Sequence, residues 1–433
     1  MNKIVSFDKE FTKLEYFLLF WALAISVRSC TLTSTLDFRI NPVGFLLTVI
    51  PCILVIRKRN IRFSNEILTM FAVLTVWVGV HYFIDRNFLI FSYFLIYVRI
   101  LVAYTLVNTF KDKLFKCFHN IVVLLTFIDL VLWVISMVIG ANTLEAIAPF
   151  VNSFSNDTGS FLIFTVPNVR IYEGQGLFGL VRNSGFCWEP GIFSCTLVLA
   201  IFCNIMVNGV KLRKNKSLIV LLFGLFSSFS TTGYCSLIVL IAGYYLFSNK
   251  TKFAGAKILS AVILIPVILY VADLPFMRAK ILEQLDKDNF LTESARMDYV
   301  EGMDGIATLT RFEGMTIDVL NIQDKPLLGY GTFSESFSYN NISENINTSN
   351  GLTNFIACYG GILTILILFL LIQNSIKLRS LFPDCNNSFL LVLLAISISY
   401  SFVPFPIFMA LSLYYFFKND KSPSDYENIS NRC

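Results

Sequence analysis

Residues 119–140 read HNIVVLLTFIDLVLWVISMVIG, and between His119 and Gly140 the only charged side chain belongs to Asp129. The hydrocarbon core of a bilayer is about 30 Å thick, and a helix needs roughly 20 mainly apolar residues to cross it. This stretch has that length and composition. We therefore expect a membrane-spanning helix here, and similar runs recur along the chain.

The overall composition indicates the same environment. Of the 433 residues, 55% are hydrophobic and 15% are charged, which is too apolar for a water-soluble domain with one ordinary core. A membrane β-barrel would show short alternating strands in place of long runs. The sequence predicts an all-α polytopic integral membrane protein with about 12 transmembrane helices, near residues 14–28, 42–56, 67–83, 89–110, 119–140, 191–208, 217–230, 233–248, 256–274, 353–373, 387–401 and 403–417. The pairs 217–248 and 387–417 are also compatible with re-entrant hairpins.

The placement of basic residues predicts the orientation. Short loops rich in Lys and Arg stay in the cytoplasm, and twelve crossings put the clusters 57–62, 111–116, 211–216, 250–257 and 377–379 on one side. Both termini then lie on the cytoplasmic side of a bacterial inner membrane. The predicted segments are helices one to five in 1–140, a periplasmic loop in 141–190, helices six to nine in 191–274, a second periplasmic loop in 275–352, helices ten to twelve in 353–417, and a cytoplasmic tail in 418–433.

The second large loop contains an amphipathic pattern. From Ser294 to Asp324, apolar residues recur at helical spacing, which predicts helix rather than coil. Lys325-Pro326 ends the pattern, and Gly329 and Gly331 permit a tight turn after it. These helices are expected to lie against the bundle or in the plane of the membrane interface.

The densest polar segment is RNSGFCWEPG, residues 182–191, where the first large loop enters a predicted helix. A carboxylate followed by proline is an ordinary helix start, so Glu189 has a purely structural interpretation. A functional interpretation is equally open. Glu189 would accept a proton from a substrate hydroxyl, and Arg182 would hold an anion through its guanidinium group.

Four segments together resemble the O-antigen polymerases and the related O-antigen ligases. They are the Arg, Ser-Gly, aromatic and Glu-Pro of residues 182–190, the Ser/Thr-rich break SSFSTTG at 227–233, Thr310-Arg311 followed by PLLGYG at 326–331, and Asn350 followed by YGGI at 359–362. Ligases of this superfamily usually carry His directly before that Asn, whereas Ser349 stands here. The resemblance therefore favours a polymerase.

The resemblance implies a GT-C-like architecture and polymerisation of undecaprenyl-pyrophosphate-linked repeat units into O-antigen or capsule at the periplasmic face. The leaving group is a lipid pyrophosphate, and arginines stabilise its charge without a metal. The implied catalytic residues are Glu189, Arg182 and Arg311. The implied substrate-binding residues are Arg170, Glu173, Arg296, Gly329, Gly331 and Asn350.

Several alternatives stay open. Asn350 is equally suited to capping the following helix, and Arg99, a charge inside a predicted span, invites a functional hypothesis or simply pairs within the bundle. The chain has no CxxC and no Cys/His cluster at metal spacing, so we expect no metal and no cofactor, and nucleic acid is an unlikely partner. Expected partners are lipid, a flippase and a chain-length regulator. A ligase acting on lipid A core and a lipid-linked oligosaccharide flippase are the competing functions.

Overall fold

The computed structural model describes residues 7–29, 36, 41–84, 90–139, 160–161, 163–165, 180–210, 212–213, 215–247, 307–308, 311–331, 346–347, 351–382, 388–398 and 400–419. Its helices are α1 (Lys13–Ser26), α3 (Pro42–Arg59), α4 (Asn65–Ile84), α5 (Ile90–Phe110), the short 3-10 helix η1 (Lys111–Lys113), α6 (Leu114–Ile139), α9 (Pro190–Asn208), α10 (Lys216–Ser227), α11 (Thr231–Phe247), α15 (Arg311–Asp324), α16 (Leu352–Leu381), α17 (Ser388–Ser397), α18 (Pro406–Ser412) and α19 (Tyr414–Phe417).

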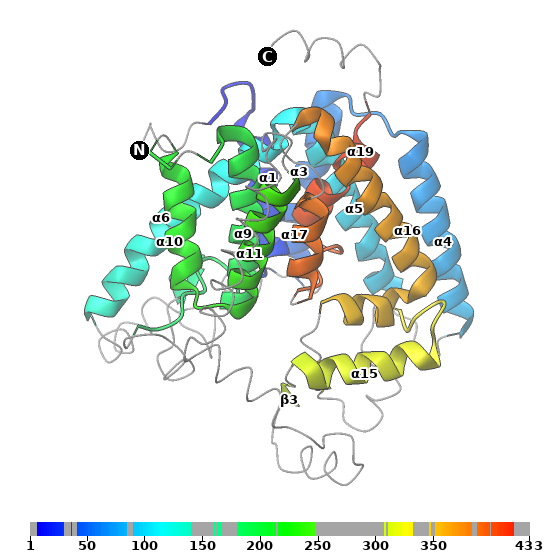
Figure 1. The fold of residues 1–433 in the computed structure, drawn as a ribbon. Coiled ribbons are helices and arrows are strands. Elements are labelled where there is room, and N and C mark those ends of the chain that lie inside the picture. The colour runs from blue at the N-terminus through cyan, green and yellow to red at the C-terminus, as the bar shows by residue number, and fades with distance from the viewer. Residues whose placement is uncertain are drawn as a thin grey trace.

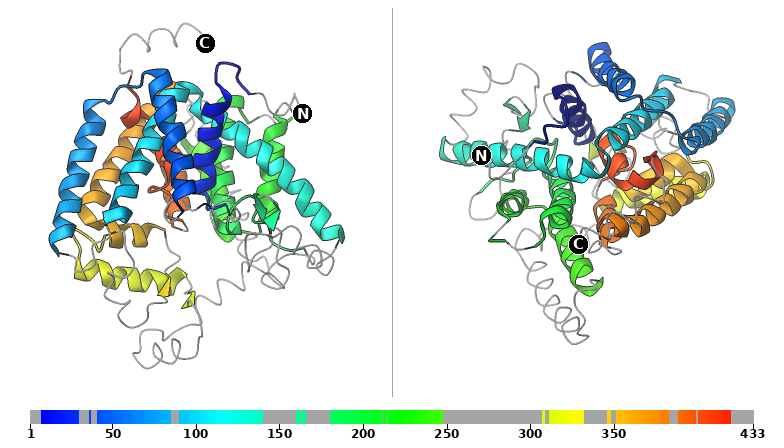
Figure 2. Two further views of the ribbon diagram at one scale, coloured as in Figure 1. Left: turned by 180° about the vertical axis from the view of Figure 1, so that it is seen from behind. Right: turned by 90° about the horizontal axis from the view of Figure 1, so that it is seen from above.

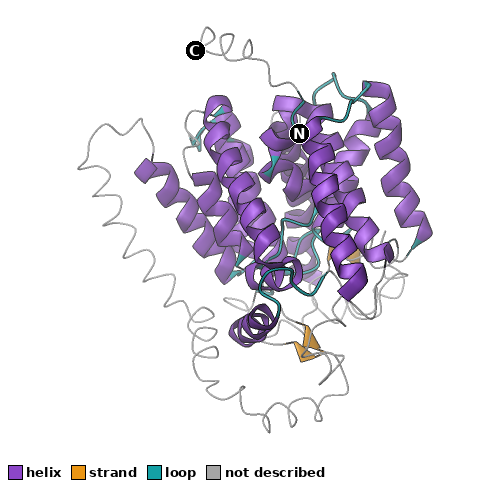
Figure 3. Ribbon diagram, turned by 90° about the vertical axis from the view of Figure 1, so that its right-hand side faces the viewer, coloured by secondary structure: helices purple, strands orange, loops and turns teal. Residues whose placement is uncertain are grey.

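The described part of the chain is a helical bundle, as Figure 1 shows. Strand structure there is limited to two pairs of two residues each. β1 (Ser160–Phe161) and β2 (Phe164–Thr165) are antiparallel, whereas β3 (Ala307–Thr308) and β4 (Ile346–Asn347) are parallel. The β1–β2 pair packs against the bundle through the buried Phe164, and helices dominate the view in Figure 3.

Among the described residues, four helical stretches are long and apolar enough to cross a membrane: α4, the run Ile90–Ile139 that joins α5 to α6 through η1, α9 and α16. The α10 helix and the apolar part of α11 are shorter. The chain is therefore a membrane α-helical protein. Helices also lie at the expected spans near 14–28, 42–56, 387–401 and 403–417, while the expected span 256–274 lies outside the described residues.

The bundle has two chemically different ends. At the first, the basic end, Arg59 contacts Glu15 of α1, Lys113 contacts Glu10, and Lys418 contacts Asp112. At the second, the distal end, the backbone N–H of Trp188 donates to the Val27 carbonyl (3.3 Å). These contacts bring the beginning of α1 beside η1, and the end of α1 beside the beginning of α9.

The α9 helix is the centre of one half of the bundle. Its residues from Pro190 to Asn204 are all buried, and it packs against α6, α10, α11 and α17. The α4 helix, by contrast, stands at the edge of the bundle and is largely exposed (Figure 2). Because a helix that is apolar on all sides is buried or faces lipid, both helices suit a membrane. Glu189 lies immediately before the first residue of α9.

The α16 helix contains a sharp break at Gly360, whose backbone (φ 74°, ψ 169°) is not helical. The break releases the carbonyl groups of Ala357 and Cys358, which accept hydrogen bonds from the backbone N–H groups of Tyr330 and Gly331, both at 2.9 Å. Backbone groups left without helical partners are thus satisfied by the 326–331 loop. This loop is consequently fixed to α16.

The α15 helix crosses the distal end of the bundle (Figure 1). It covers the last part of the amphipathic stretch predicted for 294–324, and 294–306 lie outside the described residues. Two apolar residues of the expected pattern do not face the bundle. Met315 and Val319 are exposed, whereas Ile317 and Asp318 are buried, and Asp318 accepts a hydrogen bond from Thr353 of α16 (2.6 Å). A polar contact with α16 therefore orients this helix.

Candidate functional site

The loop before α9 is held by Asn183. The Asn183 side-chain amide donates hydrogen bonds to Asp129 of α6 (2.7 Å) and to the hydroxyl of Ser227 (3.0 Å), and its oxygen accepts from the N–H of Gly185 (2.9 Å). Gly185 has φ +59°, and a Cβ there would overlap the Phe193 ring. The loop that leads to Glu189 is therefore fixed to two helices and admits no side chain at residue 185.

Arg182 lies in the same loop and is buried. Its Nε donates to the carbonyl oxygen of Ser228 (3.4 Å), and its charge interacts with the Tyr234 phenol. Ser230, which lies in the same 227–233 segment as Ser228, accepts a hydrogen bond from Ser194 of α9 (2.8 Å). The structure thus brings together two segments that the sequence singled out separately, the 182–190 loop and the Ser/Thr-rich break at 227–233.

Glu189 occupies the N-cap position of α9, with extended backbone (φ −144°) and Pro190 as the first helical residue. Its carboxylate makes no cap hydrogen bond, and it is exposed. Among the described residues, the Glu189 carboxylate also has no ion pair. The backbone of Glu189 therefore serves the helix start, while its side chain is available to another group.

Tyr400, between α17 and α18, is the point around which several charges gather. Its hydroxyl donates to the Ser26 carbonyl (2.6 Å), and its ring stacks on Phe405 (5.1 Å between centroids). The Tyr400 phenol interacts electrostatically with Arg28, Arg99 and Glu189. Three charged side chains from distant parts of the sequence thus interact electrostatically with a single phenol.

The two arginines share one aromatic partner. The guanidinium carbon of Arg28 lies 5.6 Å from the centroid of the Phe405 ring, and that of Arg99 lies 5.5 Å from it. Cation–π attraction helps to hold each group against the ring. Sequence reasoning noted Arg99 and missed Arg28. The available signal was an arginine at the end of the first predicted span, on the face where the positive-inside rule disfavours one.

Gly329 and Gly331 also lie at the distal end. Both have positive φ, and a Cβ on Gly329 would overlap the backbone of Cys358 and Gly360. A Cβ on Gly331 would overlap the Tyr93 hydroxyl. The two glycines thus permit close packing against the break in α16 and against Tyr93, while their expected role in binding substrate stays a prediction.

The 326–331 loop also contacts α4. The Leu328 carbonyl accepts hydrogen bonds from Trp77 (3.1 Å) and from Nε2 of His81 (3.2 Å). The rings of Trp77 and Tyr359 stack at 5.7 Å. His81, near the end of the expected span 67–83, thus has a structural partner in the second large loop.

The structure describes little of the remaining predicted site residues. Arg170, Glu173, Arg296 and Asn350 lie outside the described residues, and of Arg311 only the backbone, as the first residue of α15, is described. Gly351 follows Asn350 directly, and its N–H donates to the Ile398 carbonyl (3.3 Å). The beginning of α16 therefore lies beside the segment that carries Tyr400.

The chemistry open to this site is that of arginine and carboxylate. Burial raises the pKa of the Cys187 thiol well above its usual range, so this residue stays protonated and is a poor nucleophile. Within the described residues, no three His, Cys, Asp or Glu side chains form a group suited to a metal ion. An exposed carboxylate and two guanidinium groups are suited to accepting a proton and to stabilising an anion.

Comparison of the chain with protein-family models, with curated proteins and with solved structures finds no match.

Proposed function

We propose that the chain is a bacterial inner-membrane glycosyltransferase that polymerises undecaprenyl-pyrophosphate-linked repeat units into O-antigen or capsule at the periplasmic face. In this proposal the protein has about twelve spans and a GT-C-like architecture, with both termini in the cytoplasm. The observation that carries it is the exposed Glu189 carboxylate at the start of α9, which ends the loop that also holds the buried Arg182. The motif resemblance supplies the substrate class.

The orientation rests on the two ends of the bundle. The basic end gathers Arg57–Arg59, Lys111 and Lys113, which by the positive-inside rule face the cytoplasm. The distal end, with Glu189 and the 326–331 loop, then faces the periplasm. A lipid-linked sugar that has been moved across the membrane meets the site there.

The reaction needs one proton acceptor and one stabiliser of negative charge. Glu189 takes the proton as the acceptor hydroxyl attacks the anomeric carbon of the donor sugar. The bond from that carbon to the pyrophosphate oxygen breaks, and its electron pair leaves with the lipid pyrophosphate. Arg182 and Arg311 are proposed to stabilise this anion, with Arg170, Glu173, Arg296 and Asn350 binding the sugars.

The competing transporter function needs charges that line a pathway through the bundle. Asp129, the carboxylate inside α6, is buried and accepts a hydrogen bond from Asn183 of the adjoining loop. That contact explains the carboxylate as an anchor of the loop that carries Arg182. A ligase differs in its acceptor, lipid A core, and in the residue before Asn350.

The deciding experiment is deletion of the gene in its own bacterium, followed by electrophoresis of the surface glycan. A polymerase deletion leaves surface glycan that carries a single repeat unit. A ligase deletion leaves polymer on the lipid carrier, and a flippase deletion leaves neither at the surface. A normal polymer ladder would overturn the proposal, and plasmid-borne Arg182→Ala is expected to reproduce the single-repeat pattern while the protein still inserts.

A further inference from the structure

The four tryptophans of the chain differ in how their indole groups are placed. Three of them donate the ring N–H to a protein oxygen: Trp21 to the Thr48 hydroxyl (2.8 Å), Trp77 to the Leu328 carbonyl (3.1 Å) and Trp133 to the Val181 carbonyl (3.0 Å). Trp188 is 46% exposed, and its ring makes no hydrogen bond and no aromatic contact with the residues that the structure describes. A flat apolar ring and a hydrogen-bond donor are thus both available at one surface position.

Trp188 is held by its backbone rather than by its ring. Its backbone N–H donates to the Val27 carbonyl at the end of α1 (3.3 Å), and the next residue, Glu189, is the N-cap of α9. The other aromatic residue of this loop, Phe186, is buried against Phe193 (5.6 Å between centroids) and belongs to the core. The loop therefore presents one indole in a fixed position, so binding a ligand there costs little ordering of the chain.

An exposed tryptophan in a membrane protein often anchors it at the lipid interface, but the position of Trp188 argues against that role. Aromatic residues suited to such an anchor lie on α4 at the edge of the bundle, where Phe83 is 86% exposed (Figure 2). Trp188 lies instead between the end of α1 and the start of α9, whose residues 190–204 are all buried. We therefore expect its exposed ring to face the aqueous distal end of the bundle.

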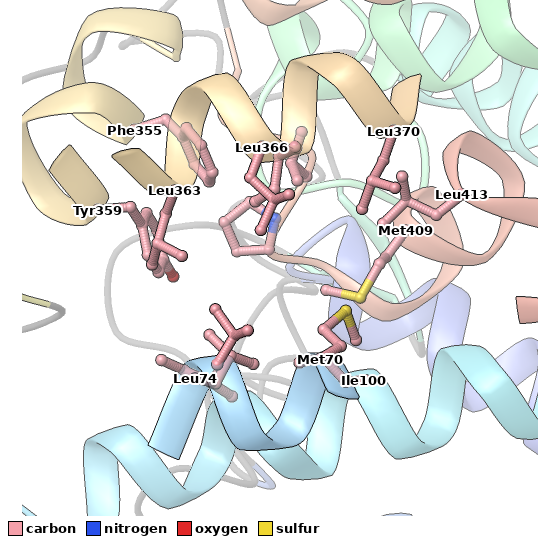
Figure 4. Close-up of a pocket in the computed structure, with 15 residues that line it drawn as sticks. Met70, Leu74, Ile100, Phe355, Tyr359, Leu363, Leu366, Leu370, Met409 and Leu413 are labelled. Atoms are coloured by element: carbon pink, nitrogen blue, oxygen red, sulfur yellow. The ribbon is translucent and has the colours of Figure 1, made fainter. Parts of the chain in front are cut away.

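The apolar cavity between α4, α5, α16 and α18 is not a place for a hydrophilic ligand (Figure 4). Leu366 of α16 and Leu74 of α4 line it from opposite sides, and Tyr359 supplies the one polar side chain of its lining. Sugar hydroxyl groups need hydrogen-bond partners when they leave water. A sugar is therefore expected at the surface that holds Trp188 and Glu189, outside this cavity.

We propose that Trp188 is a stacking platform for a sugar ring of the acceptor oligosaccharide, next to the site of proton transfer at Glu189. The C–H groups on one face of a sugar ring pack on the apolar face of the indole, and the indole N–H donates to a hydroxyl at the ring edge. Adjacent side chains in extended backbone point in different directions. The two residues therefore hold successive sugars: the terminal sugar brings its hydroxyl to Glu189, and the neighbouring sugar lies on Trp188.

The inference rests on the proposed function for the reaction, but its first test needs no polymerisation. Full-length protein in detergent is titrated calorimetrically with the free oligosaccharide repeat unit, released from the surface glycan of the same bacterium. Trp188→Ala is expected to bind it about tenfold more weakly or worse, as is usual for a tryptophan at the centre of a binding site. Trp188→Phe keeps part of the ring area and should lose less.

The exposed Phe83 of α4 provides the matched control, because Phe83→Ala removes an aromatic ring far from the platform and should bind the repeat unit as the parent does. Trp188→Ala should unfold at the temperature of the parent, since the ring has no partner among the described residues, so that lost binding is not lost folding. Equal affinity of the parent and Trp188→Ala would overturn the proposal. Absence of binding by the parent at millimolar repeat unit would overturn it as well.

A second measurement separates a sugar platform from a lipid anchor. The tryptophan fluorescence of the protein in lipid nanodiscs is quenched either by iodide in the water or by brominated phospholipid in the bilayer, and comparison with Trp188→Phe isolates the contribution of residue 188. That contribution is expected to be quenched by iodide and to be protected when the free repeat unit is added. Quenching of residue 188 by the brominated lipid alone would overturn the proposal.

Failure of this inference and failure of the polymerase are distinguishable. With lipid-linked repeat units as substrate, Trp188→Ala should raise KM and leave kcat nearly unchanged, because the platform binds the acceptor away from the reacting hydroxyl. Repeat-unit binding that depends on Trp188, in a protein whose deletion leaves a normal polymer ladder, would support the platform and overturn the polymerase. Loss of the ladder on deletion, with binding and KM unaffected by Trp188→Ala, would support the polymerase and overturn the platform.

Discussion

The two ends of the bundle use their charges differently. At the basic end the described carboxylates are paired: Arg59 binds Glu15, Lys113 binds Asp8 and Glu10, and Lys418 binds Asp112. At the distal end the exposed Glu189 has no ion pair among the described residues, although Arg28 and Arg99 share its surroundings. The ion pairs of the basic end connect segments of the fold, whereas the exposed Glu189 carboxylate at the distal end remains available to a ligand.

The largest expected effect concerns Glu189. Glu189→Gln should lower polymerisation by about 10²- to 10⁴-fold, the usual contribution of a general base. Little change in stability is expected, because the exposed side chain makes no cap hydrogen bond and no ion pair among the described residues. Polymerisation is measured with purified protein and lipid-linked repeat units. Glu10→Gln at the basic end is the matched control. If Glu189→Gln polymerises normally, the assignment of the proton acceptor is wrong.

The next effect concerns the break in α16. Gly360→Ala places a Cβ against the backbone of Leu327 and Leu328 at a φ of +74°, so we expect a loss of roughly 2–4 kcal/mol in stability and release of the 326–331 loop. Thermal unfolding and protease cleavage near residue 328 measure both. Gly79→Ala in α4 meets nothing within 4 Å and should leave the protein as stable as the parent or slightly more so. Equal unfolding temperatures for the two variants would contradict the predicted role of the loop.

A smaller effect is expected at the buried ion pair of the basic end. The Glu15 carboxylate accepts hydrogen bonds from Arg59 (2.6 and 3.0 Å) and from the N–H of Thr12 (2.6 Å), and it is fully buried. Glu15→Gln should cost about 1–3 kcal/mol of stability. Polymerisation per folded molecule should stay unchanged, since the distal end is intact. Loss of activity greater than loss of folded protein would show that the two ends are coupled.

The smallest effect is expected at Lys113, whose ion pairs are exposed. Lys113→Ala should leave the unfolding temperature at pH 7 unchanged within error, because solvent screens such pairs. Hydrogen bonding to Lys113 lowers the pKa of Asp8, and hydrogen bonding to Glu10 raises the pKa of Lys113. Any stabilisation from Asp8 is therefore lost as the pH falls below 3.8, and that from Lys113 as it rises above 10.5. Unfolding measured from pH 3 to pH 11 tests this, and a midpoint difference at pH 7 would contradict it.

The helices were largely predictable, whereas their packing was not. Apolar runs of sufficient length located α4, α5, α6, α9 and α16, because a membrane span leaves its signal in consecutive residues. The amphipathic pattern predicted the α15 helix but left open which of its faces contacts the bundle. Its apolar stripe includes the exposed Met315 and Val319, and the contact that orients it is a hydrogen bond from Thr353 to Asp318, which hydropathy does not reveal.

The candidate site was predictable only where its residues are neighbours in the chain. The 182–190 segment was recognised, and the structure adds why it holds its shape: Asn183 fixes it to Asp129 and Ser227. Arg28 was missed because its partners Phe405 and Tyr400 lie more than 370 residues away. Local patterns carry no information about such pairs.

The sequence by itself determined that the chain is helical and belongs in a membrane, because hydrophobicity acts residue by residue and accumulates along a run. It also indicated Glu189 and Gly329 as special positions, because proline and glycine impose local backbone geometry. Only the tertiary structure decided that Arg28 and Arg99 lie over one ring, that of Phe405, and that Glu189 interacts electrostatically with Tyr400. Electrostatic interaction depends on distance in space, and that distance is set by how the helices pack.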